Sequence, residues 1–175
     1  MKKRRSRPIL KRILLILVIA LSAALQYGIA FRINAAGPLP NLLLVTAVTA
    51  GYALGSEAGG FSGLCLGLYQ DAQSGKILGL YALLLLYAGV AAGQFPKKAN
   101  LGDLPAVLIT VYAITVIYEG ALYLFGYALP VVQAGLRPGM DLLRAAGFVI
   151  IPVAFMNSLC SVPFYFILRT ENAEQ

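Results

Sequence analysis

A row of glycines in the stretch from Gly55 to Gly79 constrains the fold more than any other feature of the chain. One small or acidic residue stands at every fourth position, in the order Gly55, Gly59, Gly63, Gly67, Asp71, Gly75 and Gly79. On a helix, residues four apart lie nearly above one another, so Gly59, Gly63 and Gly67 would line a groove without side chains. In a soluble helix each such glycine costs about 1 kcal/mol relative to alanine. In a membrane helix the same row lets another helix approach closely, which offsets that cost.

The composition of the chain identifies the setting as a membrane. Hydrophobic residues make up 59% of the sequence and charged residues 12%, and the mean hydropathy is +0.79. Soluble domains carry about 25% charged residues. The 175 residues leave room for one domain. The sequence therefore predicts an all-α integral membrane protein with a single membrane domain over residues 13–168.

Positive charge is concentrated at the N-terminus. Seven of the 14 Lys and Arg residues lie among the first 12 residues, directly ahead of an apolar run. Such a flank is typical of the cytoplasmic side of a membrane protein, where it meets anionic lipid. We therefore expect residues 1–12 to form a cytoplasmic arm. The net charge of +7 is attributed to the membrane and not to nucleic acid.

Apolar runs separated by polar breaks predict six transmembrane helices. They are expected over Ile13–Phe31, Asn41–Leu54, Gly59–Gln70, Ile77–Gln94, Leu104–Leu129 and Ala145–Leu168, with a polar tail over residues 169–175. The third is short, because twelve or thirteen residues reach only about 20 Å against a hydrocarbon core of about 30 Å. A re-entrant segment, or part of a bent neighbour, is the alternative for it.

The distribution of Lys and Arg favours six crossings. With six crossings ten of these residues lie in the cytoplasm and four outside, whereas the split is nine to five if the glycine segment does not cross. The positive-inside rule therefore favours six crossings, with both termini in the cytoplasm. A cleaved signal sequence is the alternative for the first run, which is longer than a typical signal-peptide core.

The glycine stretch also carries a family resemblance. Three strings resemble the signature of the rod-shape-determining protein MreD family: Gly59-Gly60-Phe61-Ser62-Gly63-Leu64, Gly67-Leu68-Tyr69-Gln70-Asp71 and Leu78-Gly79-Leu80-Tyr81-Ala82-Leu83. The chain length, the basic N-terminus and the order of the apolar runs extend the resemblance over nearly the whole chain. It implies a multi-pass protein of the bacterial inner membrane. The implied fold is similar to the six-helix substrate-binding subunits of energy-coupling-factor transporters.

The resemblance also implies a function and partners. The function would be that of a scaffold subunit in cell elongation, rod-shape determination and peptidoglycan synthesis. The direct partner would be an MreC-like bitopic membrane protein, which connects to the MreB filament, the RodA glycan polymerase and a class B penicillin-binding transpeptidase. The alternative function is that of a substrate-binding subunit of an energy-coupling-factor type transporter for a vitamin or another small molecule. A transporter subunit would need a partly polar cavity open to the outside.

Two groups of residues are candidates for contacts that hold the bundle or a partner. Gly59, Gly63, Gly67 and Gly79 are the candidate helix-packing positions, and the sequence leaves open whether they pack inside the chain or bind a partner helix. The polar candidates are Gln70, Asp71, Glu119 and Arg32.

Asp71 and Glu119 each have two interpretations. If a helix ends at Gln70, the Asp71 carboxylate faces the negative end of the helix dipole. An ion pair with Lys76 or Arg32 would compensate, and the alternative is that Asp71 caps the next turn through its own backbone. Glu119 is the only acid in a long apolar run, so it either anchors the bundle or reaches the outer interface.

Two prolines interrupt the last apolar run. Pro152 and Pro163 each remove a backbone donor, which predicts bends in the sixth helix. Asn157, Ser158 and Ser161 lie between them and would supply the bonds that the bends leave free. A substrate site on a broken helix is the alternative interpretation.

Residue types that carry catalysis are scarce. The chain has no histidine, and its two cysteines lie in apolar runs. No phosphate-binding loop of the G-x-x-x-x-G-K type occurs, and no nucleophile has a recognisable base. We therefore expect a non-enzyme that uses no cofactor or metal.

Overall fold

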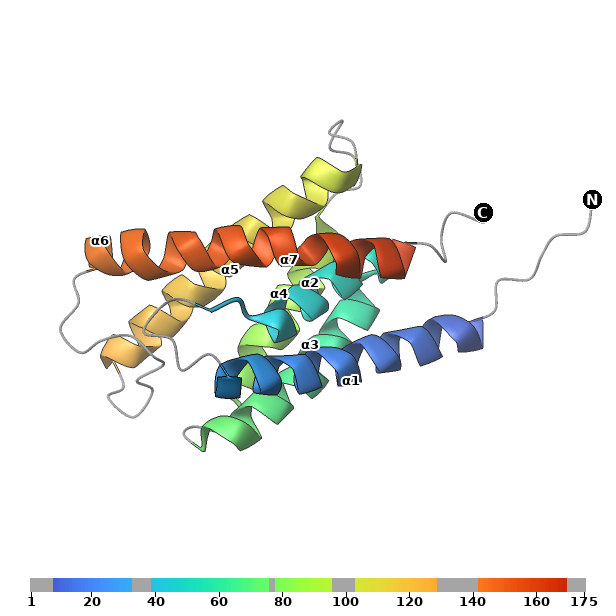
Figure 1. Ribbon diagram of the computed structural model, residues 1–175, viewed down its shortest axis with the longest axis horizontal. Coiled ribbons are helices and arrows are strands. Elements are labelled where there is room, and N and C mark those ends of the chain that lie inside the picture. Colours follow the sequence, from blue (N-terminus) through green and yellow to red (C-terminus); the bar gives the residue numbers. More distant parts are fainter. Residues whose placement is uncertain (1–7, 33–38, 76–77, 96–102, 129–141, 170–175) are drawn as a thin grey trace, which may run out of the picture.

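The computed structural model describes residues 8–32, 39–75, 78–95, 103–128 and 142–169, and every element in these ranges is helical. The elements are α1 (Pro8–Arg32), α2 (Leu42–Leu54), α3 (Ser56–Ser74), α4 (Leu80–Gln94), α5 (Asp103–Ala128), α6 (Leu142–Ala145), the π-helix η2 (Ala146–Ile150) and α7 (Ile151–Arg169) (Figure 1). The last three are continuous in sequence. The described part of the chain therefore forms the six helical segments that the sequence predicts.

The third helix is not short, and this prediction is wrong. α3 has 19 residues and reaches about 28 Å, close to the thickness of a hydrocarbon core. Ser56 and Glu57 form its first turn, where an acidic side chain suits the helix dipole. Asp71 does not end the helix but lies in its last turn. The helix ends at Gly75, whose left-handed φ of 61° lets its N–H bond the Asp71 carbonyl group.

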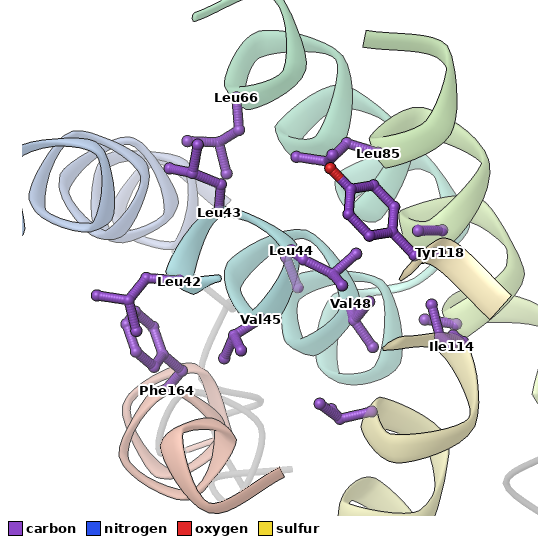
Figure 2. Close-up of a cluster of buried hydrophobic side chains, with 14 of the residues drawn as sticks. Leu42, Leu43, Leu44, Val45, Val48, Leu66, Leu85, Ile114, Tyr118 and Phe164 are labelled. Carbon is purple, nitrogen blue, oxygen red and sulfur yellow. The ribbon is translucent and has the colours of Figure 1, made fainter. Parts of the chain in front are cut away.

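α2 lies at the centre of the bundle. It contacts α1, α3, α4, α5 and α7, and every residue from Leu42 to Gly51 is buried. Figure 2 shows its side chains surrounded by those of the other helices. A helix that is apolar all round is expected to be buried in this way. The hydroxyl groups of Thr46 and Thr49 bond the carbonyl groups four residues earlier in α2, at 2.8 and 2.7 Å.

α1 and α7 bring the two ends of the described chain to one side. α1 begins at Pro8, inside the predicted arm, and proline suits the first turn of a helix. α1 packs against α2, α3 and α7. Figure 1 shows that the start of α1 and the end of α7 lie at the same end of the molecule. The two ends of a chain lie on the same side when the chain crosses a membrane an even number of times.

The outer surface of the helices is apolar. Large hydrophobic side chains are exposed on α1, α5 and α7, for example Leu17, Ile117 and Phe155 at 60%, 70% and 59% exposure. Small polar side chains such as Ser62 and Thr115 are fully buried. Soluble monomers rarely expose large contiguous apolar surfaces.

Two helices are long and apolar enough to cross a membrane. Among the described residues these are Leu104–Phe125 and Leu143–Leu168. The apolar helices that fall short of this length are Ile13–Gln26, Leu42–Leu54 and Leu80–Gln94.

The last helical segment contains one wide turn. The π-helix Ala146–Ile150 ends two residues before Pro152. A proline there donates no hydrogen bond, and its ring crowds the carbonyl group four residues earlier, so a wider turn relieves the conflict. Pro163 lies inside α7, and the helix continues past it to Arg169.

Candidate functional site

α3 and α4 are antiparallel and meet along a line of glycines. We call this line the glycine seam, and it consists of Gly59, Gly63 and Gly67 of α3, Gly89 and Gly93 of α4, and Gly51 of α2. A Cβ atom added to any of them would fall less than 3.0 Å from a backbone atom of a facing helix. Real Cβ atoms do not approach so closely, so no residue larger than glycine fits in the seam.

Three helices meet at one point of the seam. Gly51, Gly59 and Gly89 come from α2, α3 and α4. A Cβ atom on Gly59 would lie 2.5 Å from the Gly51 Cα atom and would also overlap the Gly89 carbonyl group. The three backbones are therefore in direct contact. Such close approach is how membrane helices gain van der Waals contact where lipid is as apolar as the side chains.

The glycine row of α3 is occupied within the chain. Gly59, Gly63 and Gly67 are all buried, and they face Gly89, Leu85 and Ala82 of α4. Of the two roles left open by the sequence, the structure places the row in internal packing.

Gly79 does not join the seam within the described part of the chain, and its place at a partner interface stays a prediction. It precedes α4 with a φ of 100°, and a Cβ atom there would meet nothing within 4 Å. The four-residue spacing loses its meaning at this point, because α3 has already ended at Gly75.

The seam ends at a buried carboxylate. Asp71 of α3 is only 3% exposed. Its carboxylate oxygens accept the backbone N–H groups of Gly79, Tyr81 and Ala82 at 3.0, 3.0 and 3.1 Å. These N–H groups stand at the start of α4, where a helix leaves its donors without internal partners. A negative charge at a helix N-terminus is also favoured by the dipole. Asp71 therefore caps α4 from the preceding helix.

These bonds offset the unfavourable position of the Asp71 carboxylate near the C-terminal, negative end of the α3 dipole. The sequence suggested a cap through the backbone of Asp71's own turn, but the carboxylate instead accepts three N–H groups at the start of the next helix, α4. Lys76 and the side chain of Arg32 lie outside the described residues. An ion pair between Asp71 and either of them stays a prediction.

The N-terminus of α2 is capped by side chains from α1 and α7 and by its own N-cap residue Asn41. Gln26 of α1 accepts the N–H of Leu42 at 2.7 Å, and Asn157 of α7 accepts the N–H of Asn41 at 2.8 Å. The Asn41 side chain itself accepts the N–H of Leu44 at 3.1 Å. Because α2 begins inside the bundle, its first donors need partners from the protein. Amide side chains satisfy these donors without burying a charge.

Polar residues of α7 connect it to α2 and α5. Asn157 is fully buried, and its Nδ2 atom donates to the Thr115 hydroxyl of α5 at 3.3 Å. The Ser158 hydroxyl donates to the Leu108 carbonyl of α5 at 3.0 Å. These side chains therefore join helices, and do not serve the bonds freed by the prolines.

Two further polar side chains, Gln70 of α3 and Tyr118 of α5, have a buried oxygen atom. The hydroxyl lies near the side chains of Asn41 and Gln70. Glu119 follows Tyr118 on α5, is half-buried, and has no charged partner in the described part of the chain. Whether it anchors the bundle or reaches the interface stays open.

A comparison with protein-family models gives the family. The model for the rod shape-determining protein MreD matches residues 6–170, nearly the whole chain. The chain belongs to the MreD family. No curated protein and no solved structure matches it. Membership in the MreD family makes this a bacterial membrane protein involved in determining rod shape.

Sequence reasoning overlooked part of the seam and the α2 cap in this MreD-family chain. Gly89 and Gly93 stand four residues apart on α4, and this second glycine pair indicates that α4 also packs closely against a neighbour. Gly51 is a single glycine in an apolar run, which indicates close packing. Gln26 and Asn157 are isolated amides in apolar helices, which indicates buried hydrogen bonds.

Proposed function

We propose that this MreD-family chain is a non-enzymatic scaffold subunit of the bacterial cell-elongation complex. In this role it binds an MreC-like bitopic protein through helix packing, and through it the MreB filament, the RodA glycan polymerase and a class B penicillin-binding transpeptidase. The observation that carries the proposal is the family match over residues 6–170. The proposed role needs no cofactor.

The use of polar side chains supports a structural role. Asp71 caps α4, and Gln26 and Asn157 cap α2. Each of these side chains holds the start of a helix. A scaffold requires such fixed helices, because its surface must present one shape to its partners.

A topology of six crossings with both termini in the cytoplasm is part of the proposal. The length of α3, about 28 Å, supports a full crossing by the glycine helix. The start of α1 and the end of α7 lie at the same end of the molecule (Figure 1), which supports an even number. A fluorescent protein fused after residue 175 would then fold and fluoresce, whereas a periplasmic alkaline phosphatase fusion there would stay inactive. The reverse pattern would contradict the topology.

The partner helix has to bind outside the glycine seam, because α4 already occupies it. Ala20 and Ala24 of α1 are both exposed and stand one above the other. Gly28 continues the row, and a Cβ atom there would meet nothing within 4 Å. We place the helix of the MreC-like protein on this face of α1, since small residues permit close approach.

Co-purification from native membranes tests the proposal. The tagged chain should recover an MreC-like bitopic protein, and the Ala20→Leu/Ala24→Leu variant should recover much less of it. Ala91→Leu, an equivalent change at an exposed position of α4, is the matched control and should retain binding. If the double variant recovers as much of the MreC-like protein as the unaltered chain, the partner does not bind this face of α1. Recovery of ATPase subunits without an MreC-like protein would overturn the scaffold in favour of the transporter subunit.

A further inference from the structure

α3 combines the length of a membrane helix with a composition that does not suit lipid. Its 19 residues reach about 28 Å. Among the described helices, however, α3 is neither one of the two that are long and apolar enough to cross a membrane nor one of the shorter apolar helices. Its sequence holds four glycines, two acids and two glutamines. A helix of this composition does not enter lipid by its own hydropathy.

The apolar side chains of α3 cover only one face. Phe61, Leu64 and Leu68 are exposed, and their spacing of three and four residues places them on the same side of the helix. The buried side carries the glycines together with Ser62 and Asp71. A solitary α3 would therefore turn polar groups toward lipid, where no water is available to bond them.

The polar side chains of α3 find their surroundings on three neighbouring helices. The Asp71 carboxylate bonds the start of α4. The Tyr69 hydroxyl donates to the Ala23 carbonyl group of α1 at 3.5 Å, and Gln70 lies beside the Tyr118 hydroxyl of α5. α4 contributes most, because no other pair of helices in the described chain packs as extensively as α3 and α4. The groups that make α3 unsuited to lipid are thus covered mainly by α4.

The charges that follow α4 favour entry of the two helices together. Lys97 and Lys98 come shortly after the end of α4. If α3 stayed out and α4 crossed alone, α4 would run in the opposite direction and both lysines would lie outside the cell, against the positive-inside rule. If both helices stay out, α5 and α7 keep their direction.

We propose that α3 crosses the membrane only as a pair with α4, so that the glycine seam and the Asp71 cap determine the topology of the chain as well as its stability. The two helices enter together because α4 brings the backbone surface that fits the glycines and the N–H groups that bond the carboxylate. The pairing rests on the six-crossing topology of the proposed function.

Cysteine labelling of the full chain in spheroplasts tests the pairing. Gln73→Cys stands at the exposed outer end of α3 and should react with a membrane-impermeant maleimide, and the unaltered chain gives the background. Adding Gly63→Leu, which overlaps the α4 backbone, should lower this labelling several-fold. Leu143→Cys, at the start of α6, should stay labelled beside Gly63→Leu. Gly120→Leu is the matched control and should leave the labelling of Gln73→Cys unchanged, because a Cβ atom at Gly120 meets nothing within 4 Å.

Three results would overturn the proposal. Full labelling of Gln73→Cys beside Gly63→Leu would show that α3 crosses without docking on α4. Loss of labelling at both Gln73→Cys and Leu143→Cys would show that the failure is not confined to the pair. No labelling of Gln73→Cys in the otherwise unaltered chain would contradict the six-crossing topology itself, and the pairing with it.

A second variant decides the matter if Gly63→Leu does not accumulate. Leu68→Gln makes the lipid face of α3 more polar and leaves the seam intact, because Leu68 is exposed and lies outside the seam. If packing on α4 carries α3 across, the labelling of Gln73→Cys persists in this variant. Its loss would show that α3 crosses by its own hydropathy and would reject the pairing.

Discussion

The carboxylate of Asp71 and the backbone N–H of Tyr81 are joined by a hydrogen bond of 3.0 Å, although ten residues and a helix boundary separate them. This bond and its two neighbours fix where α4 starts relative to α3. The glycine seam begins directly beyond this point, where Gly67 faces Ala82. The seam leaves no space for an added atom, so α3 and α4 can pack there only if each glycine lies opposite the right backbone atoms of the other helix. Asp71 is the residue that aligns them.

Loss of the Asp71 carboxylate should destabilise the chain. Asp71→Ala leaves three N–H groups of α4 without their acceptor, and we expect a loss on the order of 2 kcal/mol or more in unfolding free energy. Asp71→Asn keeps one oxygen acceptor and should lose less. Melting temperatures in detergent measure both.

The control for Asp71 is the exposed acid at the start of the same helix. Glu57→Ala should cost only a few tenths of a kcal/mol, because an exposed charge there contributes only through the helix dipole. Equal losses for the two alanine variants would contradict the capping role. Full rescue of Asp71→Lys by Lys76→Asp would favour an ion pair instead.

Asn157 should matter more than its partner Thr115. Asn157→Leu removes the acceptor of the Asn41 N–H at the buried start of α2, and should cost about 1–3 kcal/mol. Thr115→Val removes only the longer bond from Asn157, since the Thr115 hydroxyl otherwise bonds its own helix. Thermal unfolding of the two variants should therefore give the larger loss for Asn157→Leu. The opposite order would contradict the cap on α2.

Gly75 should accept asparagine better than alanine. Its left-handed backbone, with φ of 61°, costs an ordinary residue about 1–2 kcal/mol, and asparagine tolerates this conformation better. A Cβ atom at this position would meet nothing within 4 Å, so crowding plays no part. Gly75→Ala should lower the melting temperature more than Gly75→Asn does. Equal melting temperatures would show that α3 does not end in this conformation.

The positions of the helices could be predicted from the sequence, because apolar runs are long and polar breaks are clear. Asn41 and Gly55 mark helix boundaries by their chemistry, and both boundaries agree with the structure within one residue. The end of α3 could not be predicted from Asp71. A carboxylate near a helix end signals a boundary only if it bonds its own backbone, and here it bonds the next helix.

The pairing of helices was beyond what the sequence shows. A glycine row predicts that a helix packs closely, but it does not identify the partner. Packing against α4 and packing against a helix of another protein both fit the row in α3. Gly89 on α4 carries the complementary signal, which only becomes meaningful once α3 and α4 are known to be antiparallel neighbours. The α2 cap depends on Gln26 and Asn157, which lie 16 and 116 residues away from their bonding partners. No local pattern links such positions.

The central claim is that the glycine row of α3 serves packing against α4 within the chain. The most direct test compares Gly63→Ala with Gly120→Ala in the purified chain, where no partner is present. A Cβ atom on Gly63 would overlap the Leu85 carbonyl group, whereas one on Gly120 would meet nothing within 4 Å. We predict a loss of about 1–3 kcal/mol or more for Gly63→Ala. Gly120→Ala should be neutral or gain up to about 1 kcal/mol from helix propensity. Equal melting temperatures for the two variants would contradict the claim.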